Sequence, residues 1–428
     1  MPLEAEMLIE RLGARGDGIG TLNGQTVYVP FSVPGDHVRV RLGNRRGGGC
    51  SAELIEVLSS GPNRVDAPCS HFGECGGCVT QHLSRDAELE WKRDLVRNAL
   101  DRRGLDKVPV SDTVSIPPNS RRRTLITLTN AGGQILLGYL ARGSHHVVPI
   151  QSCTVLEPEL ERLILPLTSL GHYLHIPRQG LQISLTQTSN GLDVVIGSRM
   201  ELTLELRERL SEFARQYDLA RLSWGAVYPE PVIVRRTPVV DIGGITVEPP
   251  MGGFMQASLA AEVILRKLVI DHLNGCNHII DLFSGIGTFA LALAKKGIRI
   301  SAYDDDEEAV FALRRAGNRS AGRISINANV RDLLRRPLSA GDFRKIDGVV
   351  IDPPRAGAKQ QCQVLSESSV RKIAYVSCAP GTFARDARNL VDGGFTLTSV
   401  VLINQFSWSR HVEVVGCLER QERTAFNT

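Results

Sequence analysis

The C-terminal part of the chain alternates between short apolar segments and longer amphipathic segments. The apolar runs predict strands at 278–282, 298–303, 324–328 and 346–351. The segments with helical spacing of apolar residues predict helices at 258–273, 287–296 and 306–317. Strands and helices that alternate in this order form a doubly wound, mostly parallel sheet. We therefore predict a Rossmann-like domain over residues 251–428.

The first sixty residues follow a different pattern, in which short segments of alternating polarity are separated by glycines. The clearest of these segments are 25–30 and 37–42. Short strands joined by glycine turns are typical of a small β-barrel of the oligonucleotide-binding type. We predict this barrel over residues 1–60.

The middle of the chain combines one charged helix with a long region of β character. Residues 84–103 predict the helix, and 108–248 predict mainly strands, with helical pieces near 157–175 and 200–217. We assign residues 61–250 to a β-rich central domain, so the predicted fold class is multidomain α/β.

Composition narrows the class of protein without identifying its function. The 428 residues are 42% hydrophobic and 22% charged, which is typical of a soluble enzyme and excludes a disordered, collagen-like or coiled-coil chain. The net charge of +4 is too small to indicate a nucleic-acid partner by itself. The start of the chain lacks the basic flank and apolar run of a signal peptide, and no stretch reaches the roughly 18 apolar residues of a membrane span. We expect a cytoplasmic protein without a membrane contact.

The nine cysteines are too few for a disulfide scaffold. In a reducing compartment, clustered cysteines bind metal or take part in catalysis. Cys69, Cys75 and Cys78 lie close together, and Cys153 follows 75 residues after Cys78. Four thiolates can bind either zinc or a [4Fe–4S] cluster, and the spacing alone does not decide between them.

A glycine-containing turn after the strand at 278–282 is a candidate cofactor site. Gly285 and Gly287 allow a tight turn and a close approach of the backbone to a ligand at the strand ends. A dinucleotide fingerprint would need a third glycine where this chain has Ala290. The pattern that begins at Asp281, DxxxGxG, is instead typical of S-adenosylmethionine-dependent methyltransferases, in which the acid faces the cationic end of the cofactor.

Two further acids follow the next strands in the order that such a cofactor site requires. Asp304 ends the strand at 298–303, where it can accept hydrogen bonds from ribose hydroxyls. Asp332 comes after the strand at 324–328 and is positioned to reach the adenine. Together with Asp281, they favour a methyl-donor site over an α/β domain without a cofactor.

The ends of later strands carry candidate catalytic groups. The strand at 346–351 leads directly into Asp352, which two following prolines hold in place. Cys378 ends another strand before a helix start, where the helix N-terminus lowers the pKa of a thiol and favours the reactive thiolate. We predict a nucleophile here; the alternative is a buried core cysteine. Glu413 shares one face of a short strand with His411, a pattern that alone fits the polar face of an edge strand.

Five motifs occur in an order that resembles one enzyme family. They are FMQ at 254–256, DLFSGIGTF at 281–289, DPPRAGA at 352–358, SCAPGTFARD at 377–386 and HVE at 411–413. The chain resembles the RNA uracil-C5 methyltransferases, which make 5-methyluridine, and the resemblance covers nearly its whole length. It implies an N-terminal barrel of the TRAM type, a central domain with an iron–sulfur cluster and a C-terminal Rossmann-like class I methyltransferase domain.

The resemblance also implies a covalent mechanism. Cys378 would add to C6 of the uracil, C5 would attack the methyl group of S-adenosylmethionine, and Glu413 would then remove the C5 proton. The residues implied around the cofactor and the target base are Gln256, Phe283, Thr288, Asp304, Asp332 and Asp352. The resemblance favours a [4Fe–4S] cluster with the ligands Cys69, Cys75, Cys78 and Cys153.

The implied substrate is structured RNA, with 23S rRNA favoured over tRNA, and the implied enzyme is a monomer. Cytosine-C5 methylation is an alternative, but it would require a cysteine in the loop after Asp352, where this chain has none. A second alternative is a non-catalytic RNA-binding iron–sulfur protein with a decayed methyltransferase domain. The joint presence of Cys378, Glu413 and Asp352 opposes it.

Three basic segments are candidate RNA contacts, although such runs are as often solvated faces. They are Arg39, Arg41, Arg45 and Arg46 in the barrel, Arg121–Arg123 in the central domain, and the arginines of 314–336.

Three positions depart from the family pattern. Ala379 stands where asparagine is common, Asp304 replaces a glutamate, and Phe406-Ser407-Trp408-Ser409 replaces FPxT. None of the three removes a group that the chemistry requires.

Overall fold

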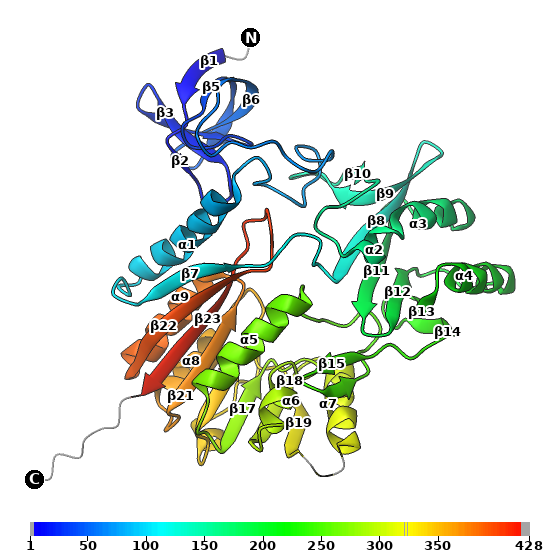
Figure 1. Cartoon of the computed structure of the whole chain (residues 1–428), viewed down its shortest axis with the longest axis vertical. Coiled ribbons are helices and arrows are strands. Elements are labelled where there is room, and N and C mark those ends of the chain that lie inside the picture. Colours follow the sequence, from blue (N-terminus) through cyan, green and yellow to red (C-terminus); the bar gives the residue numbers. More distant parts are fainter. Residues whose placement is uncertain (1–3, 321, 323, 421–428) are drawn as a thin grey trace, which may run out of the picture.

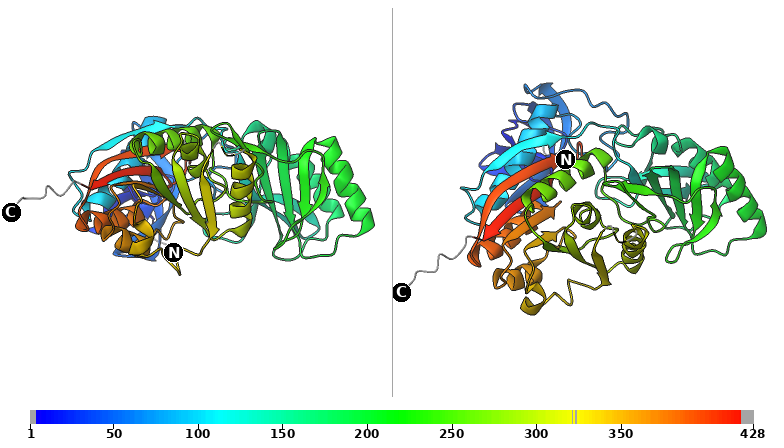
Figure 2. Two further views of the ribbon diagram at one scale, coloured as in Figure 1. Left: turned by 90° about the horizontal axis from the view of Figure 1, so that it is seen from below. Right: turned by 60° about the horizontal axis from the view of Figure 1, so that its bottom comes forward.

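The computed structural model describes residues 4–420 except 321 and 323. The described residues form three large sheets, which we call the N-terminal, central and C-terminal sheets, and one two-stranded sheet (Figure 1). The central sheet projects to one side of the other two (Figure 2). None of the helices in the described residues is both long and apolar enough to cross a membrane.

The N-terminal sheet has six strands in the order β1-β5-β6-β4-β3-β2. They are β1 (Glu4–Leu8), β2 (Arg11–Leu12), β3 (Gly18–Leu22), β4 (Gln25–Val29), β5 (His37–Arg46) and β6 (Gly49–Ser59). Alternate residues such as Val38 and Val40 face a small apolar core. A Cβ on Gly20 would lie 2.2 Å from the carbonyl oxygen of Leu8, so only glycine lets β3 approach β1 this closely. Strands β3 and β1, which are not neighbours in the sheet order, therefore lie close together, while the barrel itself stays a prediction.

Helix α1 (Arg85–Asp101) connects the N-terminal sheet to the C-terminal part and confirms the helix predicted at 84–103. Val96 and Leu100 are buried in the apolar core on one side of the C-terminal sheet. On the other side, the Trp91 indole nitrogen donates a hydrogen bond of 3.2 Å to the carbonyl oxygen of Gly13. The helix is thus packed between two domains.

The central sheet has seven strands in the order β10-β9-β8-β11-β12-β13-β14. They are β8 (Arg123–Ala131), β9 (Gln134–Leu140), β10 (Val147–Pro149), β11 (Leu181–Thr188), β12 (Gly191–Gly197), β13 (Leu219–Trp224) and β14 (Glu230–Val234). Its helices are α2 (Pro158–Glu161), α3 (Ile164–Leu170) and α4 (Leu204–Gln216), which confirm the predicted helical pieces. Leucine, isoleucine and valine fill its core.

The C-terminal sheet has eight strands in the order β19-β18-β17-β20-β21-β23-β22-β7. They are β7 (Val110–Ser115), β17 (His278–Leu282), β18 (Arg299–Asp304), β19 (Ile326–Val330), β20 (Gly348–Ile351), β21 (Lys372–Ser377), β22 (Phe395–Asn404) and β23 (Glu413–Arg420). Its helices are α5 (Leu259–His272), α6 (Ala290–Ala294), α7 (Glu307–Arg319), α8 (Lys359–Ser366) and α9 (Pro380–Asp392). Strands β17 to β21 pair in parallel, so the predicted Rossmann-like arrangement is confirmed.

Two segments of the predicted central domain pack with the C-terminal sheet. Strand β7 pairs in parallel with β22 at its edge. The hairpin of β15 (Val240–Ile242) and β16 (Ile245–Val247) buries its valines in the same core as α5 and α6. Parts of the segment 61–250, which we assigned to the central domain, therefore pack with the C-terminal domain.

Candidate active site

Three aspartates gather at the carboxyl ends of adjacent parallel strands. Asp281 lies on β17, Asp304 ends β18 and Asp352 follows β20, at the point where the strand order reverses direction. Such switch points are where doubly wound sheets bind ligands. Burial raises the pKa of Asp281 well above its ordinary value, and the carboxyls of Asp352 and Asp304 raise it further. This carboxyl cluster would be stabilised by a cationic ligand.

The glycine turn after β17 is open on one side and tightly packed on the other. Phe283, Gly285 and Gly287 all adopt a positive φ, at 63°, 52° and 94°. A Cβ on Gly285 would meet no atom within 4 Å, so the turn leaves room there for a ligand. A Cβ on Gly287 would lie 2.5 Å from Leu313 Cδ1, so that glycine is required by packing against α7. Of the two glycines predicted to give a ligand access, only Gly285 borders free space.

Two buried polar groups beside this turn lack hydrogen-bond partners. Both carboxylate oxygens of Asp281 and the Ser284 hydroxyl oxygen are unpaired among the described residues. The Ala290 amide is near enough to lower the pKa of Asp281 against the effect of burial, but its geometry is not that of a hydrogen bond. Unpaired buried groups are costly, so these atoms are positions where a bound ligand would supply partners.

Asp304 is engaged with the same turn. Its Oδ2 accepts a hydrogen bond of 2.7 Å from the Gly285 amide, and its Oδ1 accepts one of 2.9 Å from the Asp306 amide. Burial raises its pKa above the ordinary value. The carboxyl that was predicted to bind ribose hydroxyls thus also fixes the shape of the glycine turn.

Two buried amides connect Asp352 with Glu413. Gln256 Nε2 donates to Asp352 Oδ2 at 3.1 Å. Gln405 Nε2 donates both to Gln256 Oε1, at 3.2 Å, and to Glu413 Oε2, at 2.8 Å. When both carboxyls are ionised they can only accept, and the direction of every hydrogen bond in this chain of four residues is then fixed.

Gln405 was not predicted from the sequence. It follows the buried end of β22 and belongs to none of the five motifs. Its position directly after a buried strand was the only signal in the sequence. That position could not reveal its partners, Gln256, which lies 149 residues away in the chain, and Glu413, which lies 8 residues away.

The two carboxyls at the ends of this chain have pKa values near neutrality. Burial and then the nearby Asp352 raise the pKa of Glu413 to about 8. Burial and then Asp304 raise the pKa of Asp352 to about 7. A carboxyl with such a pKa can accept or release a proton near physiological pH, as a general acid or base must.

Cys378 lies at the end of β21, directly before α9, and is partly exposed. Burial is the largest cause that raises its pKa above the ordinary value, and the Glu413 and Asp352 carboxyls add to it, while Arg355 lowers it. The pKa of this thiol is therefore raised, and the expectation that the helix N-terminus would lower it is wrong. The reason is that the thiol is half-buried and the charges of two carboxyls act on it, which strand-end placement does not reveal.

Arg355 lies between the thiol and His411. Its Nη2 donates to His411 Nε2 at 3.1 Å. Burial and then Arg355 lower the pKa of His411 to about 4, so the imidazole is neutral near pH 7 and can accept this hydrogen bond. Arg355 also lowers the pKa of the Cys378 thiol, through its charge and through a side-chain hydrogen bond.

Helix α9 holds the loop at 352–358 in place. Asp386 Oδ2 accepts hydrogen bonds of 2.7 Å from the Ala358 amide and from the Tyr375 hydroxyl. Arg385 donates to the carbonyl oxygen of Ala356 at 2.9 Å. Since Tyr375 belongs to the strand that ends at Cys378, the loop and the thiol are held by one helix.

Three predicted site residues lie near the cluster without contacting the chain of amides. Phe283 and Thr288 belong to the glycine turn and are partly exposed. Asp332 lies beyond β19, where its Oδ1 accepts hydrogen bonds from the Leu334 and Arg335 amides at 3.1 and 3.0 Å. Their roles in binding a ligand stay predictions.

The four predicted metal-binding cysteines line one cavity of about 340 Å³, which we call the cysteine cavity. They are Cys69, Cys75, Cys78 and Cys153, all of them free thiols. Burial raises the pKa of Cys78 to about 12, with smaller contributions from the other three thiols. Across residues 4–320, 322 and 324–420, no three or more His, Cys, Asp or Glu side chains converge closely enough to hold a single metal ion. The thiols therefore surround a space instead of one point.

The basic segments predicted to contact RNA are partly engaged within the protein. Arg39 pairs with Glu6 and Glu56, and Arg41 pairs with Glu4 and Glu53, all on the exposed face of the N-terminal sheet. Exposed pairs of this kind are weak, so phosphates could still compete for these arginines.

Arg122 is a structural residue and not an RNA contact. It is buried, forms an ion pair with Glu262 and donates a hydrogen bond of 3.0 Å to the carbonyl oxygen of Gln256. Its neighbour Arg123 lies over the exposed ring of Phe254, 4.3 Å from the ring centroid. The prediction of an RNA contact is thus wrong for Arg122, which instead positions the segment of Gln256.

Comparison with known proteins identifies similar enzymes over nearly the whole length. Residues 250–421 match the family model described as tRNA (Uracil-5-)-methyltransferase. Residues 6–62 match the TRAM domain of tRNA (uracil(54)-C(5))-methyltransferase, which confirms the predicted N-terminal TRAM domain. An uncharacterised RNA methyltransferase of Rhizobium meliloti is 37% identical over 96% of this chain and 98% of its own.

Two similar proteins carry more specific names. The 23S rRNA (uracil(1939)-C(5))-methyltransferase RlmD of Chromohalobacter salexigens is 33% identical over 96% of this chain and 88% of its own. The crystal structure of the Pyrococcus abyssi tRNA (uracil-54, C5)-methyltransferase in complex with S-adenosyl-L-homocysteine has a TM-score of 0.75. It covers 97% of this chain and 100% of that chain at 24% identity, a likeness that concerns the fold.

Proposed function

The chain belongs to the RNA uracil-5-methyltransferase family, and on that premise we propose that it methylates C5 of one uridine in structured RNA with S-adenosylmethionine as donor. We favour 23S rRNA as the substrate, because the relative that is 33% identical over nearly the whole chain is itself named for 23S rRNA. A tRNA substrate is the second candidate, since the matched family model and the similar crystal structure are named for tRNA.

One observation carries this proposal: a partly exposed thiol has its pKa raised by a nearby buried carboxyl whose own pKa is about 8, and the same part of the sheet carries a cluster of carboxyls at its switch point. The thiol is Cys378, and the carboxyl is Glu413. Uracil C5 methylation needs a nucleophile for C6, a base for the C5 proton and a site for a cationic methyl donor. The site combines all three kinds of group.

The residues around the glycine turn fit S-adenosylmethionine. Its sulfonium and ammonium groups are positive, and the unpaired carboxylate of Asp281 and the neighbouring Asp352 would stabilise them. When bound, this donor supplies an electrophilic methyl group. We propose that Asp304 binds its ribose and Asp332 its adenine, and that Gln256, Phe283 and Thr288 border the same site.

The proposed reaction uses Cys378 and Glu413 in turn. The Cys378 thiolate adds to C6 of the uracil, and the electron pair of the C5–C6 double bond makes C5 a nucleophile. C5 takes the methyl group, and S-adenosylhomocysteine leaves. The Glu413 carboxylate then accepts the C5 proton, the C5–C6 double bond forms again, and the thiolate is expelled. Arg355 supports the first step because it lowers the pKa of the thiol against the effect of burial.

Deletion of the gene tests the activity and the substrate together. We expect 5-methyluridine to disappear at one position of 23S rRNA, because one site of this kind modifies one accessible uridine. Mass mapping of nucleosides in separately purified rRNA and tRNA measures this. Loss from tRNA alone would select the second substrate, and unchanged 5-methyluridine in both pools would contradict the activity in the cell.

The alternatives are less compatible with the site. A cytosine-C5 enzyme would carry its cysteine in the loop at 352–358, which contains none. A non-catalytic protein would have no need for the hydrogen bonds that connect Glu413 through Gln405 and Gln256 to Asp352. Because one chain contributes all these groups, we also propose that the enzyme acts as a monomer.

We further propose that Cys69, Cys75, Cys78 and Cys153 bind a [4Fe–4S] cluster. All four thiols line the cysteine cavity, and the resemblance of the chain to the RNA uracil-C5 methyltransferases favours a cluster over zinc. Methyl transfer needs no redox step, so the role we assign to the cluster is structural or RNA-binding.

Replacement of Cys153 by serine tests the cluster. We expect anaerobically purified Cys153→Ser protein to lose most of the iron, the acid-labile sulfide and the broad visible absorbance of the wild type, because one ligand in four is removed. Metal analysis and absorbance spectra measure this. Cys50→Ser, which changes a cysteine of β6 outside the cavity, is the control and should keep all three signals. A wild-type protein without visible absorbance would contradict the cluster.

A further inference from the structure

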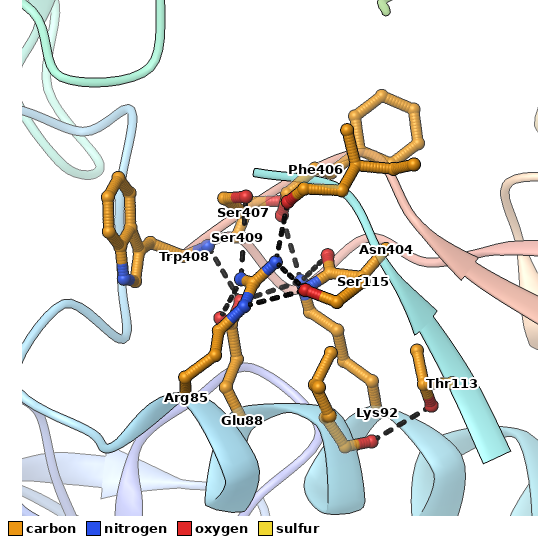
Figure 3. Close-up of polar contacts among 12 residues, drawn as sticks. Arg85, Glu88, Lys92, Thr113, Ser115, Asn404, Phe406, Ser407, Trp408 and Ser409 are labelled. Carbon is orange, nitrogen blue, oxygen red and sulfur yellow. Dashed lines mark hydrogen bonds and ion pairs between the residues drawn. The ribbon is translucent and has the colours of Figure 1, made fainter. Parts of the chain in front are cut away.

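The segment 404–409, which carries Gln405, is held by buried charges on helix α1. Lys92 is fully buried, and its ammonium donates to Asn404 Oδ1 at 2.7 Å and to the carbonyl oxygen of Phe406 at 2.8 Å. These two acceptors lie on either side of Gln405. One ammonium group therefore holds the Asn404 side chain and the Phe406 backbone together (Figure 3).

Glu88, one helical turn before Lys92, completes the arrangement. Its Oε1 lies 2.8 Å from the Lys92 ammonium and accepts a hydrogen bond of 2.6 Å from the Trp408 amide. Its Oε2 accepts one of 2.7 Å from Arg85, which also donates to the carbonyl oxygen of Ile116 at 2.7 Å. Both oxygens of this fully buried carboxylate thus have partners, as a buried charge requires.

The cysteine-rich segment holds the same loop from the opposite side. The amides of Val79 and Thr80, which directly follow Cys78, donate to the carbonyl oxygen of Trp408 at 2.7 and 3.2 Å. Trp408 adopts a φ of 59°, which is unfavourable for a residue with a side chain and persists only where the surroundings enforce it. The loop therefore has one conformation, set from two sides.

We propose that Glu88 and Lys92 form a clamp that positions Gln405 and, through it, Glu413 for removal of the C5 proton. The proposal rests on the proposed role of Glu413 as the base. Both residues are positioning residues, because neither contacts the thiol or the carboxyl cluster. The clamp acts through the amide of Gln405, which must reach Glu413 and Gln256 at 2.8 and 3.2 Å at the same time. A misplacement of about 1 Å can lower a rate roughly 100-fold.

Stability alone does not account for these buried charges. Val96 and Leu100 already attach α1 to the C-terminal core through apolar contacts. A buried ion pair pays for the loss of hydration of both charges, and well-packed apolar residues of similar size hold a helix at least as firmly. What apolar residues cannot do is bind the carbonyl oxygen of Phe406 and the amide of Trp408, which is where the two charges meet the loop.

The test is the double variant Glu88→Gln/Lys92→Met, which removes both charges and keeps the size of the side chains. With rRNA from the gene-deletion strain and tritiated S-adenosylmethionine, we expect kcat to fall about 10- to 100-fold while KM for RNA changes less than about 3-fold. We also expect a labelled covalent RNA–protein adduct to accumulate, because the addition of the thiol still occurs and the proton removal is slow. The adduct is measured as a band that resists denaturing electrophoresis.

Arg93→Met is the matched control. It removes another cation of α1, one that pairs with Asp112 and Glu90 and has no contact with the segment 404–409 among the described residues. It should behave like the wild type. A second variant, Asn404→Ala, changes the loop and not the helix, and removes one acceptor of the Lys92 ammonium. It tests the clamp if the double variant does not fold. We expect it to show the same pattern to a smaller degree.

Two outcomes would overturn the clamp. In the first, the double variant has the same kcat and adduct level as Arg93→Met; if the double variant does not fold, Asn404→Ala takes its place in this comparison. In the second, the clamp variant is folded, but the rate of methylation and the amount of adduct both fall. Glu413→Gln in the same assay separates this failure from a failure of the proposed function. If Glu413→Gln accumulates the adduct and the clamp variants do not, only the clamp is wrong; if Glu413→Gln forms none, the proposed base is wrong.

Discussion

We expect the Cys378→Ala variant to lose methyl transfer by at least about 1000-fold and to form no covalent RNA adduct. Without a thiolate at C6, uracil C5 is not nucleophilic enough to accept the methyl group, and no other described cysteine lies at a strand end beside the carboxyl cluster. Removal of an essential nucleophile has effects of this size in other enzymes. Transfer of a tritiated methyl group to rRNA from the deletion strain measures the loss.

The variant should keep its fold and its ligands. Cys378 is partly exposed, so the alanine leaves no large cavity in the core. Binding of S-adenosylmethionine, measured by calorimetry, should change little, because the carboxyl cluster is intact. Cys417→Ala, which changes a half-buried cysteine of β23 without an assigned role, is the matched control and should retain activity. Methylation by Cys378→Ala at the rate of this control would contradict the covalent mechanism.

The fold of the C-terminal part was predictable because its signals are local. Each strand and helix has its own periodicity, and a parallel sheet brings the carboxyl ends of its strands to one edge. Asp281, Asp304 and Asp352 follow three such strands, so their meeting at the switch point follows from the topology. The same reasoning locates Cys378 at the end of β21.

The groups that orient the site were not predictable, because their partners lie far away in the chain. Lys92 and Glu88 have the i, i+4 spacing of an exposed helical ion pair, and only the packed structure shows that both are fully buried. Arg122 belongs to a run of three arginines that fits an RNA-binding surface, yet its partner Glu262 is 140 residues away. A charge pattern gives no information about burial when the contacts are non-local.

The pairing of β7 illustrates the same limit for the fold. Its sequence predicts a short strand, but nothing in six residues of mixed polarity shows which sheet they join. It joins β22, nearly 300 residues away, because α1 returns the chain to the edge of the C-terminal sheet. The raised pKa of Cys378 has a similar origin, since burial by the packed structure is its largest cause and the Glu413 and Asp352 carboxyls add to it.

We expect the Glu413→Gln variant to transfer one methyl group to RNA and then stop at the covalent adduct. Addition of Cys378 and methylation of C5 do not need the carboxylate, whereas removal of the C5 proton does, so elimination of the thiol is blocked. Glutamine keeps the size of the side chain and can still accept the hydrogen bond from Gln405. Labelled adduct on denaturing gels should approach one per enzyme, while released 5-methyluridine falls at least about 100-fold.

The pH dependence provides an independent check on the same residue. Proton removal requires ionised Glu413, so in the wild type the rate of adduct release should increase with pH with a midpoint near 8, the pKa to which burial and Asp352 raise this carboxyl. The residual release in Glu413→Gln should lack this dependence. Quenching single-turnover reactions between pH 6 and 9 measures it, and an identical profile in both proteins would exclude Glu413 as the base.

The same raised pKa makes a prediction about stability with a definite sign. An unfolded glutamate titrates near its ordinary pKa of 4.5, whereas Glu413 in the folded protein titrates at about 8. Between these values the folded protein binds a proton at Glu413 that the unfolded chain has released, so the contribution of Glu413 to the free energy of unfolding decreases as the pH rises from 4.5 to 8. Glutamine has no such proton. Glu413→Gln should therefore lose less stability over this range and melt at a higher temperature than the wild type at pH 8, with a smaller difference at pH 5. Thermal unfolding at both pH values thus shows whether Glu413→Gln stops at the adduct because it lacks the base or because its fold is damaged. A damaged fold would melt at a lower temperature than the wild type at both pH values.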